Sequence, residues 1–353
     1  MENKERLYWN VVKGIAIFLM LWGHCIQFCA LDAVDYFANS VFKTIYSFHM
    51  PLFMLVSGYM FYFSFCKRNL RSLLVHRIQD MLHPIVFCTV VNNLLMMIPQ
   101  KILSGQTQLF FGAVFRGIEY SFWFLWAVLI SSVAVGVACK ITRNAGLQFV
   151  LSVLGGVFVA LFPQWELSLA MYPYFVAGFF CAMYRGSLAA VFHKLKYASF
   201  VVFPLMLAFF EVKHYVYITP VYSPALGLAE SLKIDIFRWG IGFVGSAWLM
   251  TVLDLALRTG FLEKRVPWLL KAFSRMGENS LQIYCLSEPL LSGYLPHLYR
   301  KLMEPFGCNL FAGNMVVYNF VLTPLLAVAY AVLIYCLVLL LRKVKLHSFI
   351  FGR

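Results

Sequence analysis

The chain has 353 residues, of which 62% are hydrophobic and only 12% charged, and its mean hydropathy is +0.78. Soluble globular proteins do not have this composition, so we expect an integral membrane protein. The net charge of +14 comes without a basic stripe, a zinc-ligand spacing or an RNA-binding motif. We therefore expect no nucleic-acid partner and attribute the charge to cytoplasmic loops, which are rich in Lys and Arg in membrane proteins.

Apolar segments follow one another along the chain, most of them near the ~20 residues that a helix needs to cross a bilayer. We predict helices at about 11–31, 41–63, 82–99, 122–139, 147–163, 168–184, 198–216, 234–257, 279–296 and 314–341. The connections between them are too short for a separate soluble domain. The sequence therefore predicts an all-α, polytopic membrane bundle of about ten transmembrane helices, forming a single domain over residues 1–353.

The distribution of Lys and Arg predicts how this bundle is oriented. With the N-terminus in the cytoplasm, 20 of the 29 basic residues fall on the inner side, and Lys13 lies within a span. Eight fall on the outer side, namely Lys43, Lys101, Arg116, Lys213, Lys233, Arg238, Arg300 and Lys301. Because the excess marks the cytoplasmic side and the number of spans is even, we predict that both termini are cytoplasmic.

The first predicted span carries two ionisable side chains, Lys13 and His24, which are costly in a bilayer and therefore candidates for function. Eleven residues at about 100° each exceed three full turns by only ~20°, so both side chains lie on one helix face, ~16 Å apart along the axis. His24 can serve as a general base at neutral pH. The structural alternatives are a packing histidine bonded to a carbonyl, and a lysine that extends to the inner interface.

The second predicted span carries His49, followed by Met50 and Pro51, where proline releases backbone groups from helical hydrogen bonding. His49 could bind an acceptor hydroxyl or assist proton transfer. The alternative is a histidine that bonds a carbonyl released by Pro51. Ser57 and Gly58 are interpreted as small residues that allow close helix packing.

Later spans add a few polar or amphipathic candidates. Trp123 and Trp126 begin the fourth span, where tryptophans of the membrane interface are the default interpretation. Glu288 lies in the ninth span before Pro289 and could orient His24 by accepting its second N–H, or pair with Lys13. The nine cysteines form no CxxC pair, so we interpret them as packing residues and predict neither a disulfide nor a metal site.

Four segments carry a resemblance when taken together: KGIAIFLMLWGH from Lys13, FHMPLFMLVSGYMF, SFWFLWAVL and GENSLQIYCLSEPLL. The first has a basic residue, ten further residues and then His. This set resembles the acyltransferase-3 family of integral membrane acyltransferases, and most closely its fucose O-acetylase-like branch. Two positions depart from the family pattern: Lys13 stands where many relatives have Arg, and Ser287 stands where relatives often have His.

The resemblance implies a multi-pass O-acyltransferase of the bacterial inner membrane, in particular an O-acetyltransferase. Its donor would be cytoplasmic acetyl-CoA, and its acceptor a hydroxyl of a surface-polysaccharide sugar or a lipid-linked glycan precursor. His24 would be the general base, Glu288 a second catalytic residue, and Lys13 the ligand of a coenzyme A phosphate. His49, Trp123 and Trp126 would bind the acceptor, and no metal is implied.

Two other classes of function remain open from the residues alone. Intramembrane His, Lys and Glu also suit the proton relay of a secondary transporter or flippase for a glycan or lipid precursor. Transporters often have repeated halves with broken helices in corresponding positions, and this sequence has no such symmetry. A non-catalytic membrane assembly partner is the second alternative, against which the presence of both Lys13 and His24 argues.

Overall fold

The computed structural model describes residues 3–29, 35–104, 110–162, 165–288, 290, 291, 299, 301 and 314–351. Every secondary-structure element within these ranges is helical, which confirms the predicted all-α class. The elements are α1 (Asn3–Phe28), α2 (Ser40–Lys67), α3 (Leu70–Ser104), α4 (Phe110–Tyr120), α5 (Trp123–Ile141), α6 (Ala145–Val159), α7 (Trp165–Met183), α8 (Arg185–Leu195), η1 (Lys196–Ala198), α9 (Ser199–Ala208), η2 (Val212–His214), α10 (Gly227–Arg258), α11 (Phe261–Arg265), α12 (Pro267–Glu278), α13 (Ser280–Glu288), α15 (Met315–Val317), η5 (Tyr318–Leu322), α16 (Thr323–Lys343) and α17 (His347–Phe351).

Seven helical stretches in the described part of the chain are long and apolar enough to cross a membrane. They are Lys4–Phe28, Ser40–Lys67, Trp123–Ile141, Trp165–Met183, Arg185–Ala208, Gly227–Arg258 and Met315–Lys343. The polytopic helical bundle is thereby confirmed. The other three predicted spans correspond to α3, to the shorter apolar helix α6, and to α13, whose predicted continuation lies largely outside the described residues. The number of ten and the side of both termini therefore stay predictions.

The chain forms two compact units, each built from segments that are far apart in the sequence. The first consists of Met1–Met50, Lys196–Val212 and Val244–Leu346. The second consists of Pro51–Leu195, Lys213–Phe243 and His347–Arg353. The single domain expected over residues 1–353 stays a prediction, and the two units are described separately below.

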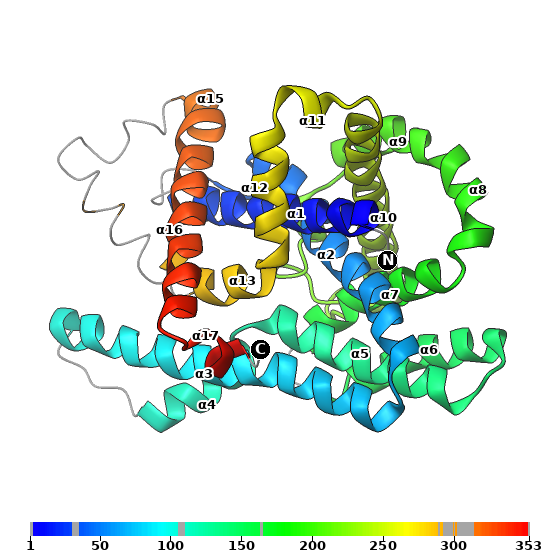
Figure 1. Ribbon diagram of the computed structural model, residues 1–353, viewed down its shortest axis with the longest axis horizontal. Coiled ribbons are helices and arrows are strands. Elements are labelled where there is room, and N and C mark those ends of the chain that lie inside the picture. Colours follow the sequence, from blue (N-terminus) through cyan, green and yellow to red (C-terminus); the bar gives the residue numbers. More distant parts are fainter. Residues whose placement is uncertain are drawn as a thin grey trace. The chain divides into compact units, whose positions relative to one another are not determined.

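In the first unit, α1 packs against α12, α13 and α16 (Figure 1). Two glycines bring α1 and α12 close together. A Cβ on Gly14 would overlap the carbonyl oxygen of Phe273, and a Cβ on Gly277 would overlap that of Asn10. Because backbone atoms cannot rotate away as a side chain can, this close approach depends on a missing side chain on both helices. The contact determines which part of α12 lies beside Lys13.

A π-helical turn, η5, ties the end of α1 to the start of α2 within the same unit. The Tyr318 hydroxyl donates to the carbonyl oxygen of Ile26 on α1 at 2.6 Å. The neighbouring Asn319 accepts from Asn39 at 2.6 Å, and Asn39 also accepts from two N–H groups in the first turn of α2. The side chains of Tyr318 and Asn319 are both buried. Tyr318 thus contacts the end of α1, and Asn319 contacts the residue that caps α2.

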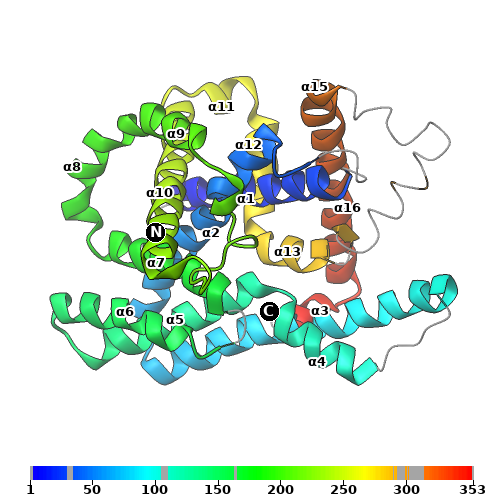
Figure 2. The same cartoon turned by 180° about the vertical axis from the view of Figure 1, so that it is seen from behind.

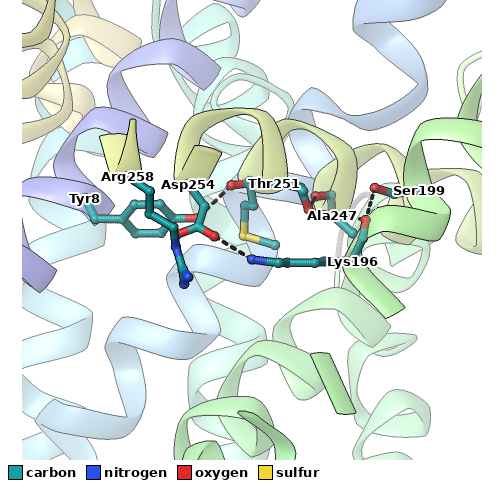
Figure 3. A network of polar contacts seen from close by, with 8 residues as sticks. Tyr8, Lys196, Ser199, Ala247, Thr251, Asp254 and Arg258 are labelled. Carbon is teal, nitrogen blue, oxygen red and sulfur yellow. Dashed lines mark hydrogen bonds and ion pairs between the residues drawn. The ribbon is translucent and has the colours of Figure 1, made fainter. Parts of the chain in front are cut away.

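A polar network joins α1, η1 and α10 in the first unit (Figure 3). The Asp254 carboxylate accepts from Lys196 at 2.7 Å and from Arg258 at 2.8 Å. The Tyr8 hydroxyl donates to the carbonyl oxygen of Met250 at 3.2 Å. Because Asp254 interacts with two cations, its charge is compensated, and the network fixes the beginning of α1 against α10.

In the second unit, α5 packs against α3, α6 and α7 (Figure 2) and is buried along most of its length. The Tyr172 hydroxyl of α7 donates to the carbonyl oxygen of Ser152 on α6 at 2.5 Å. A Cβ on Gly58 of α2 would overlap the carbonyl oxygen of Phe175, and one on Gly178 of α7 would overlap a carbonyl of α2. This close approach confirms the interpretation of Gly58 as a small packing residue.

A buried ion pair in α10 holds the segment around η2 within the second unit. Arg238 donates to Asp235 at 2.6 Å, to the carbonyl oxygen of His214 at 3.1 Å and to that of Thr219 at 2.9 Å. Both charged side chains are almost fully buried. Arg238 is one of the outer-side charges of the predicted topology, and its side of the membrane stays a prediction. The structure shows that its charge is compensated within the second unit. Such an arrangement fits a buried guanidinium, which is costly unless it is paired and hydrogen-bonded.

Candidate active site

Lys13 and His24 lie on α1, which continues without interruption from Asn3 to Phe28. Both side chains are half-buried. The predicted placement of the two residues on one helix is therefore confirmed, and with it the ~16 Å rise between them along the axis. Their catalytic and donor-binding roles stay predictions, and their surroundings indicate what each side chain can do.

The His24 ring is held between an aromatic side chain of its own helix and Tyr46 of α2. It stacks on Phe28 with ring centroids 5.5 Å apart and 11° between the planes. The Tyr46 hydroxyl lies 3.4 Å from His24 Nδ1 and 3.4 Å from Oε1 of Gln27. These distances are at the long end of the range for hydrogen bonds. His24 thus contacts a hydroxyl group as well as apolar rings.

His49 is fully buried, and its backbone contact fixes the position of its ring proton. Its Nδ1 lies 2.8 Å from the carbonyl oxygen of Ile45. Because a carbonyl only accepts, Nδ1 carries the proton and Nε2 of the neutral ring has a lone pair. Pro51 releases the carbonyl of Ser47, one helical turn before it. The carbonyl that His49 bonds is thus a different one from that released by proline.

The structure brings His24 and His49 together around Tyr46. The Tyr46 ring lies edge-on to both histidines, with ring centroids 6.4 Å from His24 and 4.8 Å from His49. The two histidines are close enough for an electrostatic interaction between them. Two imidazole rings, each able to accept or donate a proton, therefore lie near one another on either side of the Tyr46 ring.

A carboxylate of α12 lies within electrostatic range of Lys13. The charge of Glu278 acts favourably on the Lys13 ammonium, whereas that of Arg6, also on α1, opposes it. Glu278 also accepts from the side-chain amide of Asn10 at 3.2 Å. The pairing of Lys13 with Glu288 that the sequence suggests stays a prediction, and Glu278 is a further acidic residue whose charge acts on Lys13. The close packing of α1 and α12 at Gly14 and Gly277 explains why the charge of Glu278 acts on Lys13.

Glu288 is half-buried at the last residue of α13, a helix that packs against α1. The neighbouring Ser287 is buried, and its hydroxyl donates to the carbonyl oxygen of Tyr284 at 2.8 Å. Ser287 therefore has a local structural contact within α13. The proposed roles of Glu288 toward His24 stay predictions.

Trp123 and Trp126 begin α5 in the second unit, after a backbone conformation that is rare for a bulky residue. Phe122 has φ 56° and ψ 33° and is buried. Left-handed backbone at such a residue is strained and tends to occur where function requires it. Trp126 Nε1 donates to the carbonyl oxygen of Ile118 at 2.8 Å, and the Trp123 ring lies edge-on to Tyr217 at 6.2 Å. Both tryptophans are half-buried.

Lys13, His24, His49 and Glu288 thus belong to the first unit, and the two tryptophans to the second. Sequence reasoning missed Tyr46, Gln27 and Glu278. The first two had a signal: Tyr46 precedes His49 by three residues and Gln27 follows His24 by three, a spacing that places side chains on the same helix face. Glu278 had no such signal, because its proximity to Lys13 depends on how two distant helices pack.

The cysteines and the metal-ligand residues give no further site in the described ranges. Eight cysteines there are free thiols. No group of three or more His, Cys, Asp or Glu side chains that could hold a metal ion occurs among the described residues.

Comparison with known proteins identifies relatives. A model of the family Acyl_transf_3, described as an acyltransferase domain, matches residues 6–343. The nodulation protein NolL of Mesorhizobium japonicum is 30% identical over 204 residues, which are 55% of this chain and 52% of that protein. The protein of the same name from Sinorhizobium fredii is 33% identical over 132 residues, or 36% and 35% of the two chains. The chain therefore aligns with about half or less of each relative's length, and no solved structure matches it.

The family match covers most of both compact units and includes every candidate site residue considered above. It agrees with the resemblance seen in the four sequence segments. Together with seven described helical stretches that are suited to crossing a bilayer, it shows that the chain is a multi-pass membrane protein of the acyltransferase-3 family of acyltransferases.

Proposed function

We propose that this acyltransferase moves an acetyl group from cytoplasmic acetyl-CoA to a hydroxyl of a surface-polysaccharide sugar or a lipid-linked glycan precursor in the bacterial inner membrane. The observation that carries the proposal is the arrangement of α1. One continuous helix carries a cation, Lys13, and a histidine, His24, whose ring contacts Tyr46 and lies near His49. The rhizobial origin of the relatives supports a bacterial location.

In the proposed reaction His24 is the general base. It removes the proton from the acceptor hydroxyl as that oxygen attacks the thioester carbonyl of the donor. The new C–O bond forms, the C–S bond breaks, and the departing thiolate takes up the proton from the histidine. The acetyl group is transferred without a change in oxidation state, so no redox partner is needed. Glu288, on a helix that packs against α1, is proposed to help orient His24.

Lys13 is proposed to bind a phosphate of coenzyme A. A lysine ammonium binds phosphate as a point charge, and Arg6 lies near enough to contribute a second positive charge. The ~16 Å from Lys13 to His24 along α1 is comparable to the length of a pantetheine arm. The nucleotide end could thus stay near the cytoplasmic surface while the thioester reaches the histidine.

The acceptor is proposed to contact His49, Trp123 and Trp126. His49 supports this role because its Nε2 lone pair can accept from a sugar hydroxyl. The tryptophan rings offer flat apolar faces on which a sugar ring can pack, and Tyr217 lies against Trp123 with 53% of its surface exposed. The strained backbone at Phe122 supports a functional reason for presenting these rings.

The proposed function is tested with the purified protein in nanodiscs. We expect it to release free coenzyme A from acetyl-CoA only when a glycan acceptor from the native surface is present. Mass spectrometry of surface glycans from cells with and without the protein should show a difference equal to one acetyl group. Identical glycans, together with uptake or translocation of a glycan precursor by proteoliposomes, would instead support the transporter interpretation.

The cytoplasmic position of the donor depends on the predicted topology, which is directly testable. On a cysteine-free background, a cysteine introduced at Arg71 is expected to be protected from an impermeant maleimide in intact cells. One introduced at Arg116 is expected to react, because the positive-inside bias places α4 on the outer side. Labelling of position 71 from outside would reverse the orientation.

Replacement of Lys13 tests donor binding. Lys13→Ala is expected to raise the apparent KM for acetyl-CoA about tenfold or more, because a charge-assisted contact is worth roughly 1.5–3 kcal/mol. Lys13→Arg should keep most of the affinity, since it keeps the positive charge. The measurement is the dependence of initial rate on acetyl-CoA concentration.

Glu278→Gln is the matched control for Lys13, because it removes the neighbouring carboxylate but leaves the ammonium in place. Its KM for acetyl-CoA should not rise. If Lys13→Ala leaves KM unchanged and lowers only stability, Lys13 is a structural partner of Glu278 rather than a phosphate ligand.

A further inference from the structure

The hydroxyl of Tyr46 contacts two side chains of α1 that are three residues apart. It lies 3.4 Å from His24 Nδ1 and 3.4 Å from Gln27 Oε1. The three groups can form a chain that runs from the imidazole through the phenol to the amide oxygen. Tyr46 is the only one of them that can both donate and accept through a single atom.

The order of protons in this chain follows from the chemistry of its last member. A carbonyl oxygen such as Gln27 Oε1 accepts and cannot donate, so the Tyr46 proton points toward Gln27. The phenol oxygen is then an acceptor for the proton on His24 Nδ1. With the proton on Nδ1, the neutral ring keeps its lone pair on Nε2, which is the state that a general base needs.

The packing around Tyr46 holds its ring in the position that this chain requires. A Cβ on Gly23 would overlap Cε2 of Tyr46, so the glycine before His24 leaves room for the phenol ring against α1. On the other side the ring stacks on Phe42, with centroids 3.9 Å apart and 24° between the planes. The ring therefore cannot move away from α1 or along α2 without losing these contacts.

We propose that Tyr46 is a positioning residue that, together with Gln27, holds His24 in the tautomer with its proton on Nδ1 and its lone pair on Nε2. The consequence for catalysis rests on the proposed function, in which His24 is the base. The tautomer itself does not depend on that function. The tautomer of His24 can therefore be measured without any acyl transfer, and the turnover rate tests its role in catalysis.

The tautomer is tested by nitrogen NMR of the protein labelled with ¹⁵N-histidine in nanodiscs, at a pH where His24 is neutral. The His24 signals are identified by their loss in His24→Gln. We expect protonated Nδ1 in the wild-type protein. In Gln27→Leu the phenol has no amide oxygen to donate to, so it should donate to Nδ1 and shift the proton to Nε2. Protonated Nε2 in the wild-type protein, or no change in Gln27→Leu, overturns the proposal.

The rate is tested with Tyr46→Phe, Gln27→Leu and the double variant. Groups that orient a functional histidine are worth about 10–100-fold, so each single variant should lose turnover on this scale while KM for acetyl-CoA stays the same. Because both substitutions interrupt one chain, the double variant should lose little more than either single one. Additive losses, or full activity in Tyr46→Phe, contradict the proposal.

Tyr318→Phe is the matched control for this series. It also removes a tyrosine hydroxyl that contacts α1, but its partner is the carbonyl oxygen of Ile26 rather than His24. It should keep near wild-type turnover and leave the His24 signals unchanged. An equal loss in Tyr318→Phe would mean that the losses reflect packing of α1. A wild-type protein with the expected tautomer but no acetyl transfer would refute the proposed function alone.

Discussion

His24→Gln is expected to reduce turnover by about 10²–10⁴-fold, the usual contribution of a positioned base. Glutamine can still form hydrogen bonds with Tyr46, but it cannot take up a proton from an acceptor hydroxyl. The variant should insert and fold, because it places a polar side chain of similar size on Phe28 and Tyr46. It should also keep its affinity for acetyl-CoA, since the proposed phosphate contact at Lys13 is unchanged. Single-turnover rates and equilibrium binding of acetyl-CoA measure the two effects separately.

Two further histidine variants separate the roles of the rings. His76→Gln changes an exposed histidine of α3 and should leave turnover unchanged. His49→Gln should impair use of the acceptor more than use of the donor, because the proposed contact of His49 is with a sugar hydroxyl. A purified His24→Gln protein with near wild-type turnover would exclude His24 as the base, and the free Nε2 of His49 would then be the group to examine.

The parts of the site that could be predicted from the sequence are those set by local geometry. Lys13 and His24 share a helix because an apolar run without proline connects them, and helical periodicity then fixes their spacing. The fold class followed from composition for a similar reason. A bilayer offers no hydrogen-bond partners to the backbone, and a helix bonds its own N–H and C=O groups internally. His49 could be predicted as a candidate because an ionisable side chain in a membrane span costs free energy. Which carbonyl oxygen it bonds could not be predicted.

The contacts that sequence reasoning did not find depend on packing between distant segments. Glu288 lies in a longer apolar run and was the more conspicuous carboxylate, yet Glu278 acts on Lys13 because α1 and α12 approach closely. The carbonyl oxygens of His214 and Thr219 that Arg238 bonds lie in a segment before α10, so these contacts too are recognisable only in the folded chain. The spacing of apolar and polar residues along the sequence gives no information on contacts between such distant segments.

Gly277→Ala is expected to destabilise the protein and to weaken donor binding at the same time. Its new methyl group would overlap the carbonyl oxygen of Asn10, so α12 must move away from α1. Overpacking of this kind costs about 1–3 kcal/mol. Because α12 packs against the part of α1 that carries Lys13, the movement also shifts Lys13 itself, and KM for acetyl-CoA should rise. Gly14→Ala should have the same two effects from the other helix, through the carbonyl oxygen of Phe273.

Thermal unfolding in detergent and initial rates at varied acetyl-CoA measure these effects, and two other glycines serve as controls. A Cβ on Gly112 or Gly186 meets nothing within 4 Å. Alanine at either helical position should therefore be neutral or slightly stabilising, since glycine loses more backbone freedom on folding than alanine. Wild-type stability and KM in both Gly14→Ala and Gly277→Ala would show that α1 and α12 do not approach closely. The position of Glu278 beside Lys13 would then lose its structural basis, because that contact is what brings the two charges together.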